Sequence, residues 1–370
     1  TLILKGGKDG PVVVPGKVGE STLIERVTDP DEDSVMPPPG EGERLEHEQV
    51  EVLRKWIASG AKAPEEKIPL KPTEHWAYLP PIKSAPPKVD GQELHPIDAF
   101  LEAKRKENGL SALSSAPPEI LVRRLFLDLV GLPPTKEELE KGLEDLAKDR
   151  WAQVVDDLLG RSQFGERWGR HWMDVWRYSD WRGWGDKIRY SRKHIWRWRD
   201  WIIESVNADK GYDRMIVEML AADEVSPEDP TSLRATGFLA RNWYKFDRNV
   251  WLDDTVEHTA KAFLGITMNC CRCHDHKYDP ISQKEYYGFR AIFEPYDVRT
   301  DRIPGELDVE KDGLPRVHDA KPDAKTFFFE RGDPKRARSD ESLDPAVPSV
   351  VKGSSFDVEE GRLPILAYYP

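Results

Sequence analysis

Apolar residues recur every three or four positions through the middle of the chain, from about residue 98 to residue 300. That spacing places them on one face of an α-helix, so it predicts a succession of amphipathic helices. The segments with this pattern are 117–135, 135–149, 150–160, 164–178, 194–207, 212–223, 251–265 and 282–296. The chain is therefore predicted to be mainly α-helical, with its larger domain at residues 98–300.

End signals add detail to these helices. Thr135 with Glu138, and Ser282 with Glu285, have the spacing of a capping box. In that motif the side chain of each residue bonds to the backbone N–H of the other. Gly265 stands where the helix before the cysteines should end, because glycine adopts the left-handed backbone of a helix C-terminus without strain.

The flanking regions follow other patterns. Residues 1–66 are rich in Gly and Pro before a helical run at 46–59, which predicts a small helical unit. Residues 67–97 are Pro-rich with little periodicity and predict an extended linker lying on a surface. Residues 301–370 contain many turn signals and one strand candidate, 325–330. They are expected to form an irregular extension leading toward a further domain.

The charge balance argues against one class of partner. The chain has 55 Lys and Arg against 67 Asp and Glu, a net charge of −12. Proteins that bind nucleic-acid phosphates need a surplus of Lys and Arg, so no nucleic-acid role is expected. We find no run of about 18 or more apolar residues that would predict a transmembrane helix. Because the chain opens on TLILKGGKDG and stops on LPILAYYP, we expect a fragment of a longer protein.

All three cysteines lie in one short stretch, NCCRCHDHKY at residues 269–278. Cys270, Cys273 and His274 match Cys-x-x-Cys-His, the attachment motif of haem c. Two thiols at this spacing can add to the two vinyl groups of one haem, which places the adjacent histidine to ligate the iron from the proximal side. Cys271 occupies an x position and is not needed for attachment. The motif therefore favours a covalent haem c.

Two other uses of the cysteines stay open at this point. A zinc site needs four ligands, usually as two pairs separated in sequence. Here the four would be Cys270, Cys273, His274 and His276, crowded into one segment. A disulfide between Cys270 and Cys273 is the simpler structural alternative.

A haem iron usually has a sixth ligand, or an open position if it performs chemistry. His258, on the predicted helix before the motif, is the first candidate for a distal ligand. Met268 and His276 are too near the motif in sequence to reach the far side of the iron, and His171 is a more remote candidate. Each of these histidines could instead be a hydrogen-bonded packing residue.

Met36 lies in a Pro-rich loop, SVMPPPG, just before the helical run at 46–59. Small cytochromes c use a loop methionine of this kind as distal ligand, followed by a helix that packs over the haem. No cysteine precedes Met36, so a haem that it ligates would be attached upstream of Thr1. Without such a haem, Met36 would be a core methionine.

Tryptophans are concentrated between residues 168 and 201. Trp168, Trp172 and Trp176 recur every four residues, which is typical of one buried helix face. Together with Trp181 and Trp184 they could instead line a haem pocket or form a platform on which sugar rings stack.

Several stretches resemble a known pair of domains. MPPPGEGERLEHEQVEVLRKWIASGA resembles the end of the planctomycete-type cytochrome c domain. EILVRRLFLDLVGLPPT and FLGITMNCCRCHDHKYDP resemble the helical domain of unknown function that follows it in large exported planctomycete proteins. The resemblance covers about residues 1–300. It implies a small cytochrome-c-like helical unit, then a larger helical haem-bearing domain.

The resemblance also implies a set of site residues. One haem c would be attached at Cys270 and Cys273, with His274 as proximal iron ligand. A second haem, attached upstream of this chain, would have Met36 as a ligand.

From these features we expect a periplasmic or cell-surface c-type haem protein that transfers electrons to a redox partner protein or to other haem domains. With an open iron site it would be a haem-dependent oxidoreductase acting on a small molecule or a sugar derivative. The third expectation is a non-catalytic scaffold whose Trp-rich segment binds polysaccharide or protein.

Overall fold

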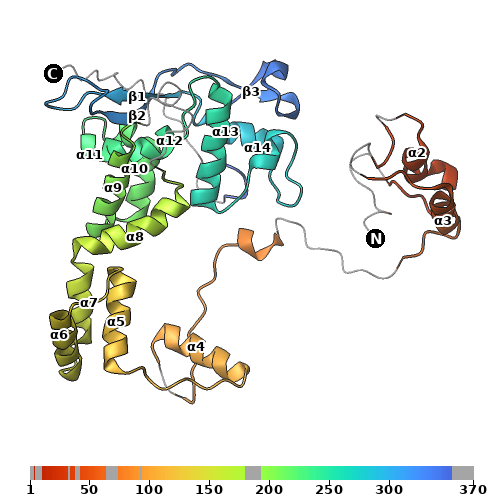
Figure 1. The fold of residues 1–370 in the computed structure, drawn as a ribbon. Coiled ribbons are helices and arrows are strands. Elements are labelled where there is room, and N and C mark those ends of the chain that lie inside the picture. Colours follow the sequence, from red (N-terminus) through yellow and green to blue (C-terminus); the bar gives the residue numbers. More distant parts are fainter. Residues whose placement is uncertain are drawn as a thin grey trace. The chain divides into compact units, whose positions relative to one another are not determined.

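The computed structural model describes residues 4, 11–31, 34–37, 42–63, 74–91, 94–179 and 193–351. The chain divides into two compact units, Thr1–Ala77 and Tyr78–Pro370. The described part is mainly helical, which confirms the predicted fold class (Figure 1).

The first unit is small and helical. It contains a 3-10 turn, Val18–Glu20, and two helices, α2 (Thr22–Thr28) and α3 (His47–Ala58). Its core is formed by Val13, Ile24, Ile57 and Ala61, with partly buried Leu53 and Trp56 packed against them. The predicted helix at 46–59 is thus present as α3.

The second unit begins with short helices that form their own small core. Its first elements are η3 (Trp76–Tyr78, at the unit boundary), α4 (Pro96–Glu107), α5 (Pro118–Leu129), α6 (Lys136–Ala147) and α7 (Trp151–Leu159). Helices α5, α6 and α7 contact one another around Val122, Phe126 and Leu158. At the start of α6, Thr135 Oγ1 accepts from the Glu138 N–H and the Glu138 carboxylate accepts from the Thr135 N–H, as predicted.

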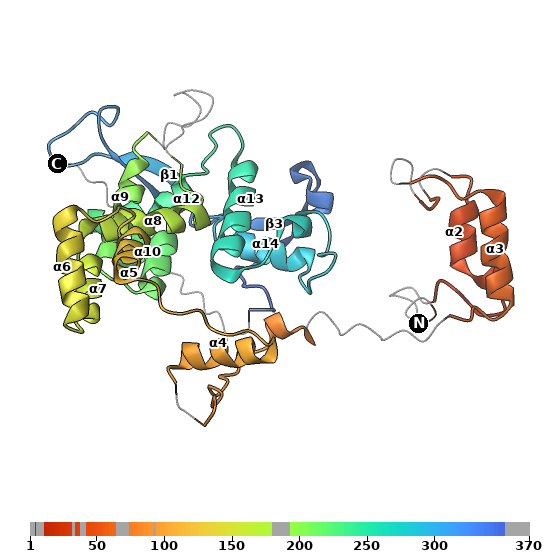
Figure 2. The ribbon, with the colours of Figure 1, turned by 60° about the horizontal axis from the view of Figure 1, so that its bottom comes forward.

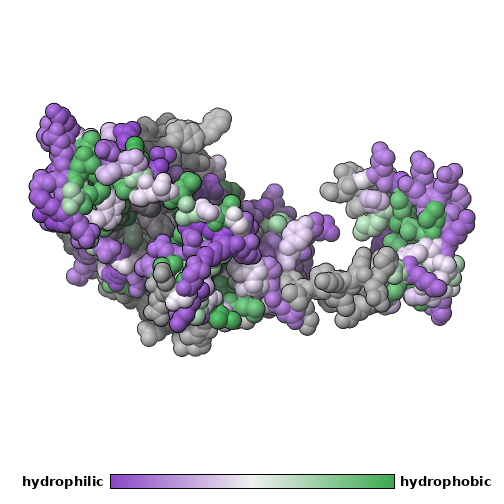
Figure 3. All heavy atoms as spheres, turned by 90° about the horizontal axis from the view of Figure 1, so that it is seen from below, coloured by the Kyte–Doolittle hydropathy of each residue, from purple (hydrophilic) through white to green (hydrophobic). Residues whose placement is uncertain are grey.

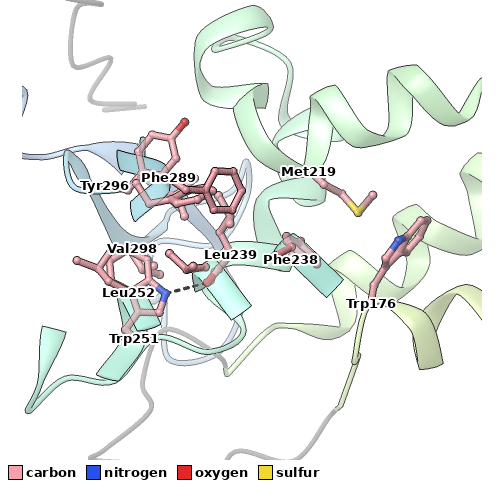
Figure 4. Close-up of a cluster of buried hydrophobic side chains, with 14 of the residues drawn as sticks. Trp176, Met219, Phe238, Leu239, Trp251, Leu252, Phe289, Tyr296 and Val298 are labelled. Atoms are coloured by element: carbon pink, nitrogen blue, oxygen red, sulfur yellow. Dashed lines mark hydrogen bonds between the residues drawn. The ribbon is translucent and has the colours of Figure 1, made fainter. Parts of the chain in front are cut away.

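The larger core lies among the helices that follow. They are α8 (Ser162–Val175), α9 (Trp196–Asn207), α10 (Tyr212–Val225), α11 (Pro230–Leu233), η5 (Arg234–Thr236), α12 (Gly237–Ala240), α13 (Arg248–Thr259), the π-helix η6 (Ala260–Leu264), η7 (Asn269–Arg272) and α14 (Gln283–Ala291). Figure 4 shows part of this core, where Trp251 Nε1 donates to the Leu239 carbonyl at 3.0 Å. Helices α13 and α14 lie side by side (Figure 2).

The tryptophan-rich segment is only partly core. Trp176 is buried and stacks on Trp172, with ring centroids 5.1 Å apart, but Trp168 is 40% exposed. The buried face predicted for Trp168 is therefore wrong, because the face of α8 that packs on α9 at this level is formed by Gly165 and Gly169. Trp181 and Trp184 lie outside the described residues.

Strands follow the last helix. β1 (Tyr296–Asp301) pairs antiparallel with β2 (Leu314–Asp319), so that Val298 lies opposite Val317. β3 (Thr326–Phe329) pairs antiparallel with β4 (Ala337–Leu343), and two 3-10 turns, η8 (Glu330–Gly332) and η9 (Pro334–Arg336), connect them. The extension from residue 301 thus contains short strands of two antiparallel pairs, connected by turns, as far as Leu343. Only β3 matches a predicted strand.

The surface is mixed. Figure 3 shows hydrophilic residues with smaller hydrophobic areas between them. Among the described residues, no helix combines the length and the apolar composition needed to cross a membrane.

Candidate functional site

The cysteine motif lies on a short turn between two helices of the second unit. The π-helix that extends α13 ends at Leu264, and Gly265, where the sequence predicts the helix to end, follows it with a left-handed backbone (φ +66°). The next turn is η7, in which the Cys270 carbonyl accepts from the N–H groups of Cys273 (3.2 Å) and His274 (3.3 Å). These bonds fold the motif on itself. After the motif, α14 begins at the predicted capping box, in which Ser282 Oγ accepts from the Glu285 N–H.

The three thiols have different environments. Cys270 is exposed and Cys273 is half-buried, whereas Cys271 is fully buried, and all three are free. The Cys271 thiol donates to the Ile281 carbonyl at 3.6 Å, and burial raises its pKa to about 11. The two motif thiols are thus closer to the surface than the spare one, and the Cys270–Cys273 disulfide considered as an alternative is not formed.

One ring nitrogen of His274 is held in a hydrogen bond to the backbone. Its side chain is exposed, and Nδ1 lies 2.7 Å from the carbonyl oxygen of Asp275. A carbonyl can only accept, so Nδ1 carries the proton of the neutral ring and Nε2 keeps its lone pair. Proximal histidines commonly have such an N–H bond to a backbone carbonyl, which fixes the tautomer that binds a metal.

His276 serves the local fold. Its Nδ1 accepts from the Asp279 N–H at 2.8 Å, and its own N–H donates to the Ile281 carbonyl at 2.8 Å. The residue therefore organises the loop that leads to α14. Among the described residues, no group of three or more His, Cys, Asp or Glu side chains is arranged to hold a metal ion. The four side chains considered as zinc ligands are thus not assembled into such a site.

The motif is held on the protein by its middle residue, Arg272. The Arg272 guanidinium donates to Asp253 of α13 at 2.9 Å, and this bond raises its pKa. The Arg272 carbonyl accepts from the amide of Gln283 at 2.9 Å and from the hydroxyl of Tyr287 at 3.0 Å. Asp253 also accepts from the buried Tyr286 hydroxyl at 2.7 Å. These contacts fix the backbone between the two motif cysteines.

The Pro-rich segment reaches the same loop. Tyr78 hydrogen-bonds to Asp279, five residues after His274, and burial together with this bond raises the pKa of Tyr78 to about 12. Neither Tyr78 nor the residues that bind Arg272 were identified from the sequence, because the contacts are long-range and no local signal marks them.

His258 is buried within the second unit. It is 8% exposed, and its Nδ1 has no hydrogen-bond partner among the described residues. Burial and the nearby Arg177 lower its pKa to about 4, so the ring is neutral at pH 7. Asp253 and Glu257 form the face of α13 that contacts η7, through Arg272 and Asn269. His258 follows Glu257 by one residue and so projects about 100° away from it around the helix.

Met36 lies in the first unit and is 49% exposed, so it is not a core methionine. Its N–H donates to the Arg26 carbonyl at 3.0 Å, which holds the loop against the end of α2. The thioether is therefore presented at the surface of that unit.

The residues of the motif fit a haem c. Two free thiols stand at the required spacing and outside the core, and the lone pair of His274 Nε2 is available beside them. Thiolate or thioether sulfur and imidazole are the groups with which proteins hold haem. A haem bound there would supply one-electron chemistry at its iron.

The amino-acid sequence matches two known protein families. Residues 1–40 match the family described as Planctomycete cytochrome C, which contains c-type haem proteins. Residues 96–298, more than half of the chain, match PSCyt2, a protein family of unknown function (DUF1549). No curated protein and no solved structure matches significantly. The chain therefore belongs to the PSCyt2 (DUF1549) family, and its first 40 residues match the planctomycete cytochrome c family.

Proposed function

We propose that this chain is part of an exported electron-transfer protein with one haem c attached at Cys270 and Cys273 and with His274 as proximal iron ligand. The observation that supports it most is the bond from His274 Nδ1 to the Asp275 carbonyl, because in the neutral ring it leaves the Nε2 lone pair free on the residue that follows Cys273. Covalent attachment suits a protein outside the cytosol, since the haem cannot be lost from it. The partners would be another haem domain or a redox protein.

Two further iron ligands, one for each haem, belong to the same proposal. The exposed thioether of Met36 would ligate a haem attached upstream of Thr1. His258 would be the distal ligand of the haem at Cys270 and Cys273, since it is neutral and its Nδ1 is unpartnered among the described residues. With both axial positions filled, the iron would exchange electrons without binding substrate.

The double variant Cys270→Ser, Cys273→Ser tests the attachment. Expressed in a periplasm equipped for c-type haem attachment, the wild type should show a Soret band that survives acid–acetone extraction. The double variant should lose that band, because no thiol remains at either motif position. Cys271→Ser is the matched control: its thiol is buried, so it should keep the covalent haem. A wild type without the band would overturn the proposal.

His258→Ala tests the distal ligand. We expect a low-spin, six-coordinate spectrum in the wild type and a high-spin spectrum in the variant, which should then bind cyanide or azide. His171→Ala, which removes an exposed histidine, should leave the spectrum unchanged. If His258→Ala has the wild-type spectrum, His258 is not a ligand. If the wild type is itself high-spin and binds azide, the haem-dependent oxidoreductase replaces the electron-transfer protein as the better assignment.

A further inference from the structure

The loop between β3 and β4 contacts the haem motif directly. Gly332, with φ +73°, lies so close to the motif that an added Cβ would stand 2.7 Å from Cys273 Sγ and 3.2 Å from the Arg272 carbonyl oxygen. Cβ atoms essentially never approach other heavy atoms within 3.0 Å. Only glycine therefore leaves the Cys273 thiol in its present position, and it also tolerates the positive φ.

A second contact ties the same hairpin to the motif backbone. The amide of Gln283, at the start of α14, donates both to the Arg272 carbonyl at 2.9 Å and to the Phe329 carbonyl at 3.0 Å. Gln283 is buried, so these bonds are shielded from water. One side chain thus links the residue before Cys273 to the end of β3.

Aromatic packing supports this link. The Phe329 ring lies 5.2 Å from the ring of Tyr287, whose hydroxyl donates to the same Arg272 carbonyl. The guanidinium of Arg290, which is also on α14, lies 5.0 Å from the centre of the Phe329 ring, in the geometry of a cation–π contact. The end of β3 is therefore anchored on α14 beside the motif.

We propose that the β3–β4 hairpin, Thr326–Leu343, completes the haem site by backing the Cys273 thiol, and that Gly332 is a positioning residue for the thioether at Cys273. This inference rests on the proposed function. It extends the haem module beyond residue 298, where the match to the PSCyt2 family ends. The hairpin is then part of the site.

The attachment chemistry depends on where the sulfur lies. On a bound haem the Cys273 thiol would add across a vinyl C=C bond: its sulfur would bond to the carbon next to the ring, and its proton would go to the terminal carbon. Nothing is released, and no external oxidant or reductant is consumed. Because both thiols must meet one rigid ring, displacing one sulfur by about 1 Å should slow its addition strongly.

Gly332→Ala is the direct test, with Gly305→Ala as its matched control. Both glycines have positive φ, but an added Cβ at Gly305 meets nothing within 4 Å. In Gly332→Ala we expect haem attached through Cys270 alone in most molecules, so that the doubly attached fraction falls about tenfold. Mass spectrometry of the haem peptide and the position of the pyridine-haemochrome band distinguish one thioether from two. Full double attachment in Gly332→Ala would overturn the inference.

Alkylation of the haem-free protein gives a readout that does not depend on haem. In the wild type, Cys270 should react with iodoacetamide faster than Cys273, and Cys271 slowest. Gly332→Ala should accelerate the reaction of Cys273 several-fold by displacing the hairpin, and Gly305→Ala should not. Gln283→Ala removes the bond to the Phe329 carbonyl without adding an atom, so it should also accelerate the alkylation of Cys273. This second variant keeps the test valid if Gly332→Ala does not fold.

The two proposals fail in different ways. A wild type that never acquires covalent haem overturns the proposed function. Cys273 alkylation that is equal in the wild type, Gly332→Ala and Gln283→Ala overturns the contact on which this inference stands.

Discussion

Replacing Asp253 by Ala is expected to lower the free energy of unfolding by about 1–3 kcal/mol, since it leaves the buried Tyr286 hydroxyl without its acceptor and removes one of the two carboxylates that pair with the buried Arg290, the other being Glu294. Arg290 is 2% exposed and donates to Asp253 at 3.3 Å, and the Tyr286 hydroxyl and the Arg272 guanidinium share the same carboxylate. The variant should therefore also release Arg272 and loosen the haem motif. Chemical denaturation gives the stability, and the yield of covalent haem reports on the motif.

Glu257→Ala is the control for Asp253→Ala. Glu257 lies one turn further along the same face of α13 and pairs with the exposed Lys261. Its removal strands no buried charge and should cost about 0.5 kcal/mol. If both variants lose the same stability, Asp253 is not the centre of a buried network.

Asp223→Asn is expected to stabilise the protein at pH 8 by about 2–4 kcal/mol. Asp223 is 7% exposed, and its Oδ1 has no hydrogen-bond partner among the described residues. Burial and the neighbouring carboxylates of Glu224 and Asp319 raise the pKa of Asp223 to about 7. A rise from the ordinary value of 3.8 corresponds to at most about 4 kcal/mol. Asparagine removes the charge and keeps the shape of the side chain.

The pH dependence has a definite sign. Between pH 4 and 7 the folded state holds the Asp223 proton more tightly than the unfolded state, so the stability from this group is complete below pH 4 and is lost as the pH rises through about 7. The difference between Asp223→Asn and the wild type should therefore grow from near zero at pH 4 to its maximum at pH 8. Asp213→Asn, an exposed change on the same helix, should differ from the wild type by less than about 1 kcal/mol at either pH. Parallel curves for Asp223→Asn and the wild type would contradict the prediction.

The elements predicted correctly are those whose cause is local. The capping boxes at Thr135 and Ser282 and the helix end at Gly265 depend only on residues within one turn. The identities of those few residues are therefore enough to predict them. The helices of the second unit carry enough apolar residues at helical spacing for the same reason.

Other features depend on contacts between distant residues. β4 is almost entirely polar and exposed, so it has no alternating pattern, and it exists because it pairs with β3. Likewise Gly332, Asp253 and Tyr78 reach the motif from positions far along the chain. Their sequence neighbourhoods contain no signal for a role beside Cys273 or Asp279, and only the fold brings them together.

The burial of Cys271 determines which of the three thiols are accessible. The sequence Cys-Cys-x-Cys offers Cys273 two possible companions, Cys270 and Cys271, and only the first has the spacing of the haem motif. In the fold, Cys271 is enclosed and its thiol is bonded to Ile281, while Cys270 stands at the surface. If haem is attached as proposed, the burial of Cys271 would leave Cys270 as the accessible partner of Cys273, so the folded protein itself would select which two thiols react.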